Sequence, residues 1–354
     1  MTSIRRSSLA TFGGLFIATS ALLTSPVSPV RAMPTDSGAG VAIVIEGQGY
    51  GHGRGMSQYG AYGWATGSYG DQTIPAEQKA KDWTWILDHY YGGTQNALTA
   101  ANKRMTVALS AINGLQTAVI SSDSTASVLL TGGPVVPGTY ASLVAREISP
   151  SGVRSTYTYR VYGSSKITCP SASDPLSTES GWTVVGEGTA TYGKPIVTFS
   201  VPNGDLPTTA PASLLGVCGS TGNVLHYRGT IFAANGSVGE NRTVNDVPVE
   251  QYLRGVVPRE SPASWGDTAN GLGINALRAQ SVAARSYSLA QGRYTYAKTC
   301  DTQSCQVYGG AASRNTAKGT LSVREDSRTD RAIVDTALTI RVRPDKPTVP
   351  VVTE

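Results

Sequence analysis

One acidic residue stands in a stretch whose neighbours restrict the backbone on both sides. Glu260 lies between Arg259 and Ser261, and Pro258 and Pro262 bracket these three residues. Proline fixes its own backbone torsion and restricts the residue before it, so ordinary helix continuation is not expected here. The sequence therefore predicts that Glu260 sits on a positioned turn, where its carboxyl group could act as an acid or a base.

A helix is predicted on the N-terminal side of this turn. Apolar residues fall at helical spacing from Val249 to Val256, and Asn245 or Asp246 could cap the helix. Its end is expected near Pro258.

A second helix is predicted from about Ile274 to Gln291, and its Ala-rich middle suits close packing against another element. Two polar residues, Gln280 and Arg285, interrupt its apolar pattern. They face either solvent or a polar cleft, where they could bind a substrate.

A Gly-rich passage near the N-terminus could also carry chemistry. Five glycines alternate with larger residues from 47 to 55, which permits a tight backbone and close approach to another surface. No Gly-Lys-Ser/Thr follows, so the passage is not a P-loop. His52, Ser57 and Gln58 are candidate substrate-binding residues, although His52 could instead be a structural histidine that hydrogen-bonds the loop.

The first 32 residues have the pattern of a signal peptide. Arg5 and Arg6 precede an apolar run from about Leu9 to Leu23, and small residues lead to a cleavage point at Ala32. The run is short and interrupted for a membrane span, although an uncleaved anchor is the alternative. We expect a secreted protein of the cell wall or extracellular space, with no stable membrane span.

The charge balance gives no support for a nucleic-acid partner. The net charge is +5, but residues 1–32 contain three Arg and no acid, so the remaining chain has 26 basic and 24 acidic residues. No basic block or arginine-rich helix is present.

Four cysteines remain after export. Disulfides between Cys169 and Cys218 and between Cys300 and Cys305 are the simplest pairing in an oxidising compartment, although sequence does not fix connectivity. Cys300 and Cys305 could instead bind zinc, but no histidine lies nearby. We expect no metal and no cofactor.

The residues that follow Cys305 could line a cleft. Gln306 and Tyr308 are candidate substrate contacts, because an aromatic face suits a sugar ring. The alternative is that Tyr308 packs beneath the loop.

The string VPVEQYLRGVVPRESPASW, followed by NALRAQSVAARSYSLA, resembles the core of the SpoIID/LytB family of exported bacterial cell-wall proteins. One branch of this family cleaves peptidoglycan glycan strands as a lytic transglycosylase during sporulation. The other branch is known as a modifier, or enhancer, of a cell-wall amidase. The catalytic glutamate of the family matches Glu260.

The resemblance implies a reaction without a second carboxyl group. Glu260 would protonate the oxygen between N-acetylmuramic acid (MurNAc) and N-acetylglucosamine (GlcNAc) and then accept the proton of the muramic 6-hydroxyl, which gives a 1,6-anhydro end. Arg259 would lower the pKa of Glu260 if it pointed inward, so we expect it to turn outward or reach the substrate. The resemblance implies peptidoglycan glycan strands as the partner and, for the amidase-enhancer branch, a cell-wall amidase. A binder that does not cleave, or a structural envelope protein, are the alternatives.

The implied fold is α+β, with an antiparallel β-rich region packed with a small set of helices. In the family, a segment like GHGRGMSQYGA with a helix ending in HYYGGT normally follows the catalytic glutamate, but here it precedes Glu260. The order is therefore apparently circularly permuted, and the Gly-rich loop is expected beside Glu260. The predicted organisation is a signal peptide (1–32), the Gly-rich segment and helix (33–102), a β-rich region (103–240), the SpoIID/LytB catalytic-type core (241–342) and a Pro/Val-rich tail (343–354).

The C-terminal end departs from the family pattern. One more helix and the start of a strand are predicted from Thr329 to Ile340, but Leu338 stands where relatives usually have Gly. The Gly-rich strand segment that usually follows is missing. This predicts an unpaired sheet edge.

Overall fold

Short segments rich in Val, Thr and Tyr form two large sheets in the protein. The computed structural model describes residues 55–122, 129–131, 140–150, 155–171, 173–207, 210, 213–237 and 240–351. The first sheet has eight strands, in the order β15 (Ser322–Val323), β14 (Ala312–Arg314), β10 (Val224–Tyr227), β9 (Leu215–Cys218), β3 (Thr117–Ser121), β5 (Ser142–Pro150), β6 (Thr156–Ser164) and β7 (Thr183–Thr191).

The second sheet has six strands and leads into the site. Its order is β13 (Thr299–Cys300), β2 (Arg104–Ala108), β12 (Asn241–Pro248), β11 (Thr230–Asn235), β8 (Pro195–Ser200) and β4 (Leu129–Thr131). Among the described strands, only β13 and β2 pair in parallel. The predicted α+β fold with mainly antiparallel strands is confirmed.

Six α-helices and three short 3₁₀ turns are described. The helices are α1 (Gln58–Thr66), α2 (Ala76–Lys79), α3 (Trp83–Tyr90), α4 (Val249–Glu260), α5 (Ile274–Ala290) and α6 (Ser327–Asp335). The turns are η1 (Ser110–Ile112), η3 (Ala263–Asp267) and η4 (Ala269–Gly271). No helix in these described ranges is long and apolar enough to cross a membrane.

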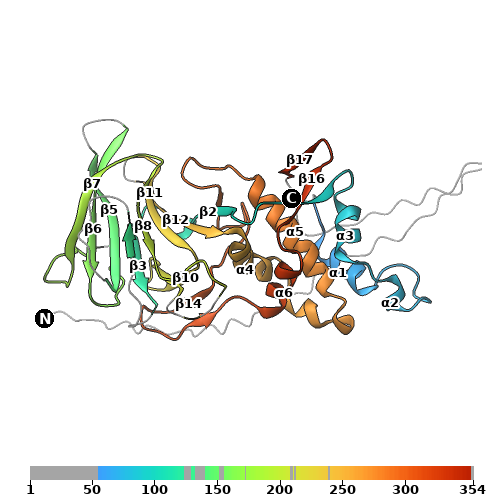
Figure 1. The fold of residues 1–354 in the computed structure, drawn as a ribbon. Helices are drawn as coiled ribbons and strands as arrows, with labels where there is room; N and C mark the ends of the chain where they lie inside the picture. Colours follow the sequence, from blue (N-terminus) through green and yellow to red (C-terminus); the bar gives the residue numbers. More distant parts are fainter. Residues whose placement is uncertain are drawn as a thin grey trace, which may run out of the picture. The chain divides into compact units, whose positions relative to one another are not determined.

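Helix α4 packs between the second sheet and the other helices (Figure 1). Its buried residues Tyr252 and Leu253 share one apolar core with strand residues such as Val119 and Ile231. Each large side chain buried in this way contributes roughly 1.5–3 kcal/mol of hydrophobic stabilisation. The start of α4 is therefore held against β2 and β12.

Helix α5 is the centre of a second core. Leu277 and Val282 of α5 pack with Ala61 of α1, Ile86 of α3 and Trp265 of η3. The predicted second helix is confirmed to within one residue, because α5 begins at Ile274 and ends at Ala290.

The first predicted helix begins later than expected. Asn245 and Asp246 are strand residues of β12, and Pro248 occupies the N-cap position of α4. The prediction that they cap the helix is wrong, because their backbone groups pair with β2 and β11 instead. Asp246 accepts from the Arg104 Nε at 2.8 Å.

Two polar residues of the β region are buried. The His226 Nδ1 forms a hydrogen bond with the Ser122 hydroxyl at 2.9 Å. Burial lowers the pKa of His226 to about 3, which fits a structural role for this histidine. The Arg228 guanidinium forms two bonds with the Glu325 carboxylate at 2.6 and 2.7 Å. Arg228 is therefore a buried ion-pair partner within the fold.

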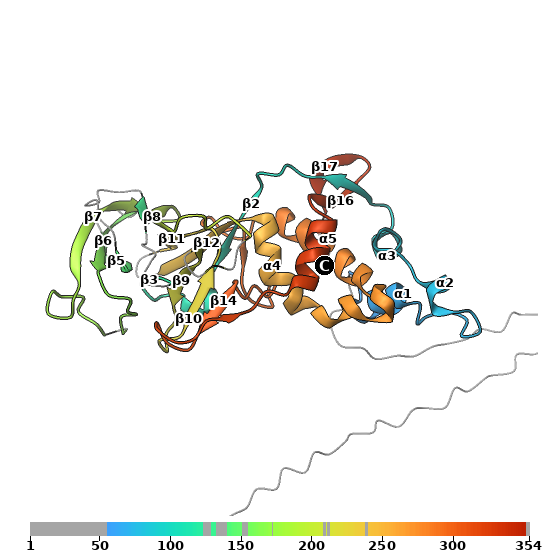
Figure 2. The same cartoon turned by 60° about the horizontal axis from the view of Figure 1, so that its bottom comes forward.

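The C-terminal tail forms a strand. Strand β16 (Thr339–Arg343) pairs with β1 (Gln95–Leu98) on one side and with β17 (Lys346–Pro350) on the other. This small sheet lies beside α5 (Figure 2). The predicted unpaired edge is wrong, because the segment after α3 and the tail both donate strands to β16. The circularly permuted order itself stays a prediction.

Leu338 adopts a left-handed backbone conformation, with φ of +63°. A Cβ in this region costs about 1–2 kcal/mol, whereas Gly has no such cost. Leu338→Gly and Leu338→Ala both remove the side chain, and only the second keeps a Cβ. The strain of about 1–2 kcal/mol exceeds the roughly 0.5–1 kcal/mol by which Gly is ordinarily less stable than Ala, so we expect the Gly variant to have the higher free energy of unfolding, by up to about 1 kcal/mol.

Denaturant unfolding of both variants measures this difference. At ordinary positions Gly is less stable than Ala, by roughly 0.5–1 kcal/mol. A Leu338→Ala variant that is more stable than Leu338→Gly would show that this position carries no backbone strain.

Candidate active site

Glu260 is the last residue of α4, and the sequence prediction placed it differently. The helix continues through Pro258 and ends at Glu260, two residues beyond the predicted end near Pro258, so Glu260 lies in its last turn and not on a separate turn. Pro258 lies in the last turn of α4. Its missing N–H removes one backbone hydrogen bond of the helix, and only two helical residues follow it. The Ser261 N–H then bonds to the Val257 carbonyl and closes the helix.

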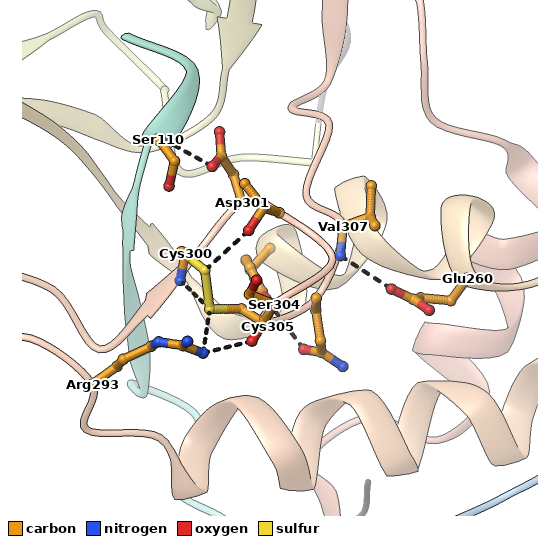
Figure 3. The surroundings of a disulfide bond; sticks show 11 residues. Ser110, Glu260, Arg293, Cys300, Asp301, Ser304, Cys305 and Val307 are labelled. Carbon is orange, nitrogen blue, oxygen red and sulfur yellow. Dashed lines mark hydrogen bonds between the residues drawn. A yellow bond between two sulfur atoms is a disulfide. The ribbon is translucent and has the colours of Figure 1, made fainter. Parts of the chain in front are cut away.

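The Glu260 carboxyl group is half-buried and has one hydrogen-bond donor. The Val307 N–H donates to its Oε1 at 3.1 Å (Figure 3). Burial raises the pKa of Glu260 above its ordinary value, and the Val307 N–H offsets this only in part. Among the described residues, no donor bonds its Oε2.

The other acids near Glu260 in sequence are engaged elsewhere. Asp267 accepts from Arg328 Nη1 at 2.8 Å at the surface. Glu250, at the start of α4, forms two bonds with the Arg285 guanidinium at 2.7 and 2.8 Å. Glu250 is therefore the ion-pair partner of Arg285 in the interior. Among the described residues, no second carboxyl group bonds to Glu260.

Val307 is held by the segment that follows strand β13. Cys300 and Cys305 form a disulfide that closes a short loop ahead of Val307 (Figure 3). Cys169 and Cys218 form a second disulfide. Both predicted disulfides are confirmed. The zinc alternative is wrong, because the Cys300 and Cys305 sulfurs are bonded to each other. The described residues contain no group of three or more acidic, Cys or His side chains arranged for a metal ion.

This segment packs tightly along α4. The Tyr252 hydroxyl donates to the Gln306 amide oxygen at 3.1 Å, and the Tyr308 hydroxyl donates to Asn245 Oδ1 at 2.7 Å. Gln306 is 8% exposed and Tyr308 is 5% exposed. Tyr308 therefore packs beneath the segment, as the alternative reading of the sequence held, and its predicted role as a sugar contact is wrong.

The two candidate residues of α5 are also interior. Arg285 is 0% exposed and donates to Glu250 and to the carbonyls of Thr339 and Ile333. The prediction that Arg285 contacts a substrate is wrong, because its side chain links α4 to α6 and β16. Gln280 is 9% exposed, so its side chain offers little surface to a ligand.

The Arg259 guanidinium lies against Gly309, and it is not among the groups that shift the pKa of Glu260. A Cβ on Gly309 would overlap the Arg259 guanidinium. Arg324, which the sequence reading did not single out, donates from Nη1 to the Gly309 carbonyl at 3.3 Å. Both guanidinium groups therefore lie two residues from the amide that contacts Glu260.

The start of α1 lies near the chain that follows Glu260. Tyr62 stacks on Trp265 with ring centroids 4.6 Å apart, and Tyr59 meets the same ring edge-on at 5.3 Å. Ser57 caps α1 by accepting from the Gly60 N–H, and Gln58 is the first helical residue. His52 lies outside the described residues.

Two cavities lie elsewhere in the described chain. One, of about 320 Å³, is lined by residues of α3 and β1 together with Arg341. The other, of about 210 Å³, is lined by Tyr227, Asn223 and Asp301, among others. The Asp301 carboxylate accepts from the Ser110 N–H at 2.9 Å, and burial raises its pKa. Neither lining includes Glu260, whose carboxyl group lies at the end of α4.

Comparison with known proteins places this arrangement in a family. Residues 237–342, which span β12, α4, α5, α6 and most of β16, match the family model described as stage II sporulation protein, SpoIID. This match supports the predicted resemblance to the SpoIID/LytB family over this part of the chain. No solved structure matches the chain.

One characterised relative is the amidase enhancer of Bacillus subtilis strain 168. It is 47% identical over 58 residues, which is 16% of this chain. The match spans only 7% of that relative's length.

Gly255 tests the packing of the segment against α4. A Cβ there would lie 2.6 Å from the Tyr308 ring, although Ala favours a helix by about 1 kcal/mol over Gly. Because overpacking typically costs about 1–3 kcal/mol, we expect Gly255→Ala to lower the free energy of unfolding despite its better helix propensity. Urea unfolding measures the change.

Gly292→Ala is the matched control for Gly255→Ala. Nothing lies within 4 Å of a Cβ at Gly292, so its change should stay within about 0.5 kcal/mol. A stabilised Gly255→Ala variant would mean that the segment does not press on α4.

Breaking the Arg285–Glu250 ion pair tests whether Arg285 stabilises the fold from the interior. Removing one partner of a buried pair leaves an uncompensated charge, so Arg285→Gln should cost about 3 kcal/mol of unfolding free energy. Arg160→Gln breaks an exposed pair with Glu187 and should cost about 1 kcal/mol or less. Equal losses in thermal or urea unfolding would contradict the interior role.

Proposed function

We propose that this protein is exported and cleaves the glycan strands of cell-wall peptidoglycan as a lytic transglycosylase, at the bond between MurNAc and GlcNAc. The observation that carries the proposal is the environment of Glu260. Its carboxyl group is half-buried, has a raised pKa and receives one backbone N–H. A general acid at neutral pH needs such an environment, because burial favours the protonated form.

The reaction can proceed with Glu260 alone. Protonated Glu260 donates its proton to the glycosidic oxygen, the bond from that oxygen to the muramic C1 breaks, and GlcNAc leaves with a hydroxyl group. The muramic 6-hydroxyl then bonds to C1 and gives its proton to the Glu260 carboxylate. A 1,6-anhydro end forms, no water is consumed, and the acid is restored.

The residues around Glu260 agree with a mechanism in which this one carboxyl group acts first as the acid and then as the base. Ordinary glycosidases use two carboxyl groups that flank the scissile bond. Glu250 and Asp267 are each bonded to an arginine, so neither supports a two-carboxylate scheme. The Val307 N–H would favour the carboxylate that exists after the first proton transfer. Arg259, Ser57, Gln58 and His52 stay candidate substrate contacts.

A second function has support from one comparison. The relative from Bacillus subtilis is named an amidase enhancer, and its match overlaps no more than 58 residues of this chain. On this alternative, the protein binds peptidoglycan and assists a cell-wall amidase without cleaving glycan.

Glu260→Gln separates the two functions. Purified protein would be incubated with glycan strands, and mass spectrometry would detect 1,6-anhydromuramic ends. We expect such ends from the wild type and a loss of at least about 100-fold from Glu260→Gln, because general acid catalysis typically contributes 10²–10⁴-fold. The wild-type rate should fall as pH rises through the raised pKa of Glu260, since only the protonated form can donate.

Two controls accompany this assay. Glu187→Gln removes an exposed carboxylate on β7 and should leave the rate unchanged. The unfolding midpoint of Glu260→Gln at neutral pH should equal or exceed that of the wild type, because the folded state no longer holds a partly buried charge. Equal cleavage by the wild type and Glu260→Gln would reject the acid assignment. No anhydro ends, with faster peptide release by an added amidase, would favour the binder.

A further inference from the structure

Two arginine side chains meet at one peptide unit beside the candidate acid. The Arg259 guanidinium lies where a Cβ of residue 309 would be, so only Gly at this position allows the contact. The Arg324 Nη1 donates to the carbonyl of the same residue at 3.3 Å. Gly309 follows Val307 by two residues, so the arginines lie roughly 7 Å along the chain from the amide that contacts Glu260.

Neither guanidinium is neutralised by the protein. Among the residues that the structure describes, no carboxylate lies within ion-pair distance of Arg259 or Arg324, and the buried Arg259 Nε has no acceptor. The adjacent acid Glu325 is fully engaged with Arg228, on both carboxylate oxygens. Burial and the charge of Arg324 lower the pKa of Arg259.

Two half-buried cations without a counter-charge are unfavourable to the folded protein, whereas many other arginines of the described residues bond to an acid. Arg104, Arg160, Arg254, Arg278, Arg285 and Arg328 each have a carboxylate partner. An arrangement that is costly alone but complementary to an anion is typical of a ligand site. The planar guanidinium fork matches the geometry of a carboxylate or a phosphate, and peptidoglycan strands carry carboxylates.

We propose that Arg259 and Arg324 form a carboxylate-binding site that positions the muramic sugar next to Glu260. This inference rests on the proposed action on peptidoglycan. That polymer offers a carboxylate in two places: the lactyl group of a muramic residue without a stem peptide, and the stem peptide itself. Both belong to the sugar whose bond Glu260 would protonate, so the site would set which bond reaches the acid.

The test measures binding of glycan fragments to the full mature protein by calorimetry. A Glu260→Gln background is used so that no strand is cut. The probes are peptide-free glycan strands, peptide-bearing strands, and each of these after amidation of its carboxylates. In this background we expect carboxylate-bearing strands to bind about ten-fold or more tightly than their amidated forms, because bonds to charged groups contribute roughly 1.5–3 kcal/mol.

Three variants assign the effect to the arginines. Arg324→Gln and Arg259→Gln should each weaken binding about ten-fold and remove the difference between free and amidated strands. Gly309→Ala keeps the charge but displaces Arg259, and should act in the same direction. Arg331→Gln makes the same charge change on an exposed α6 side chain and should leave binding unchanged. Unfolding midpoints are measured for every variant.

The outcomes separate this inference from the proposed function. Selective binding of peptide-free strands identifies the lactyl carboxylate as the ligand, and selective binding of peptide-bearing strands identifies the stem peptide. Equal binding of free and amidated strands, or an effect of Arg331→Gln as large as that of Arg324→Gln, overturns the site and leaves the proposed function standing. No binding of any strand overturns both.

Discussion

The site depends on how closely the segment after β13 approaches α4. Gly255 lacks a side chain where the Tyr308 ring crosses the helix, and the Gly309 N–H bonds to the Gly255 carbonyl at 3.1 Å. This contact fixes the segment in register along the helix. As a result, the Val307 N–H faces Glu260 and the Gly309 backbone faces Arg259. A shift of one residue would move the Val307 N–H away from Glu260, so the hydrogen bond to the candidate acid depends on this backbone packing.

The two ends of α4 show how one helix can hold two carboxyl groups in different roles. Glu250 at the first turn is bonded to the fully buried Arg285 guanidinium, so it links α4 to α5. Glu260 at the last turn has a backbone amide and partial burial, without a cation that bonds to it. Burial without a counter-charge favours the neutral acid, whereas an ion pair favours the carboxylate. The helix therefore separates a structural acid from one suited to proton transfer.

Sequence was informative where local rules and ordered motifs act. The span of α5, the existence of a β-rich region, both disulfides and the position of Glu260 near a proline-restricted bend followed from patterns visible in the chain. The helix start was misplaced because pairing of Asn245 and Asp246 in β12 overrode their capping propensity.

The roles of Arg285 and Tyr308 were misjudged because polar residues in an apolar helix or loop can be buried when partners from distant segments satisfy them. Glu250, Asn245 and Thr339 supply those partners, and no local pattern reveals them. No sequence pattern pointed to Arg324. The strand formed by the tail, β17, could not be predicted because it depends on pairing with β16.

The central claim is that burial at the end of α4 keeps the Glu260 carboxyl group protonated at higher pH than an ordinary glutamate. Titration of the side-chain carboxyl carbons by NMR, with ¹³C-labelled glutamate and Glu260→Gln to assign the resonance, measures this pKa directly. The structure predicts a value above the 4.5 of an unperturbed glutamate. A value at or below 4.5 would contradict the account, because Glu260 would then be a carboxylate throughout the range in which a general acid must donate.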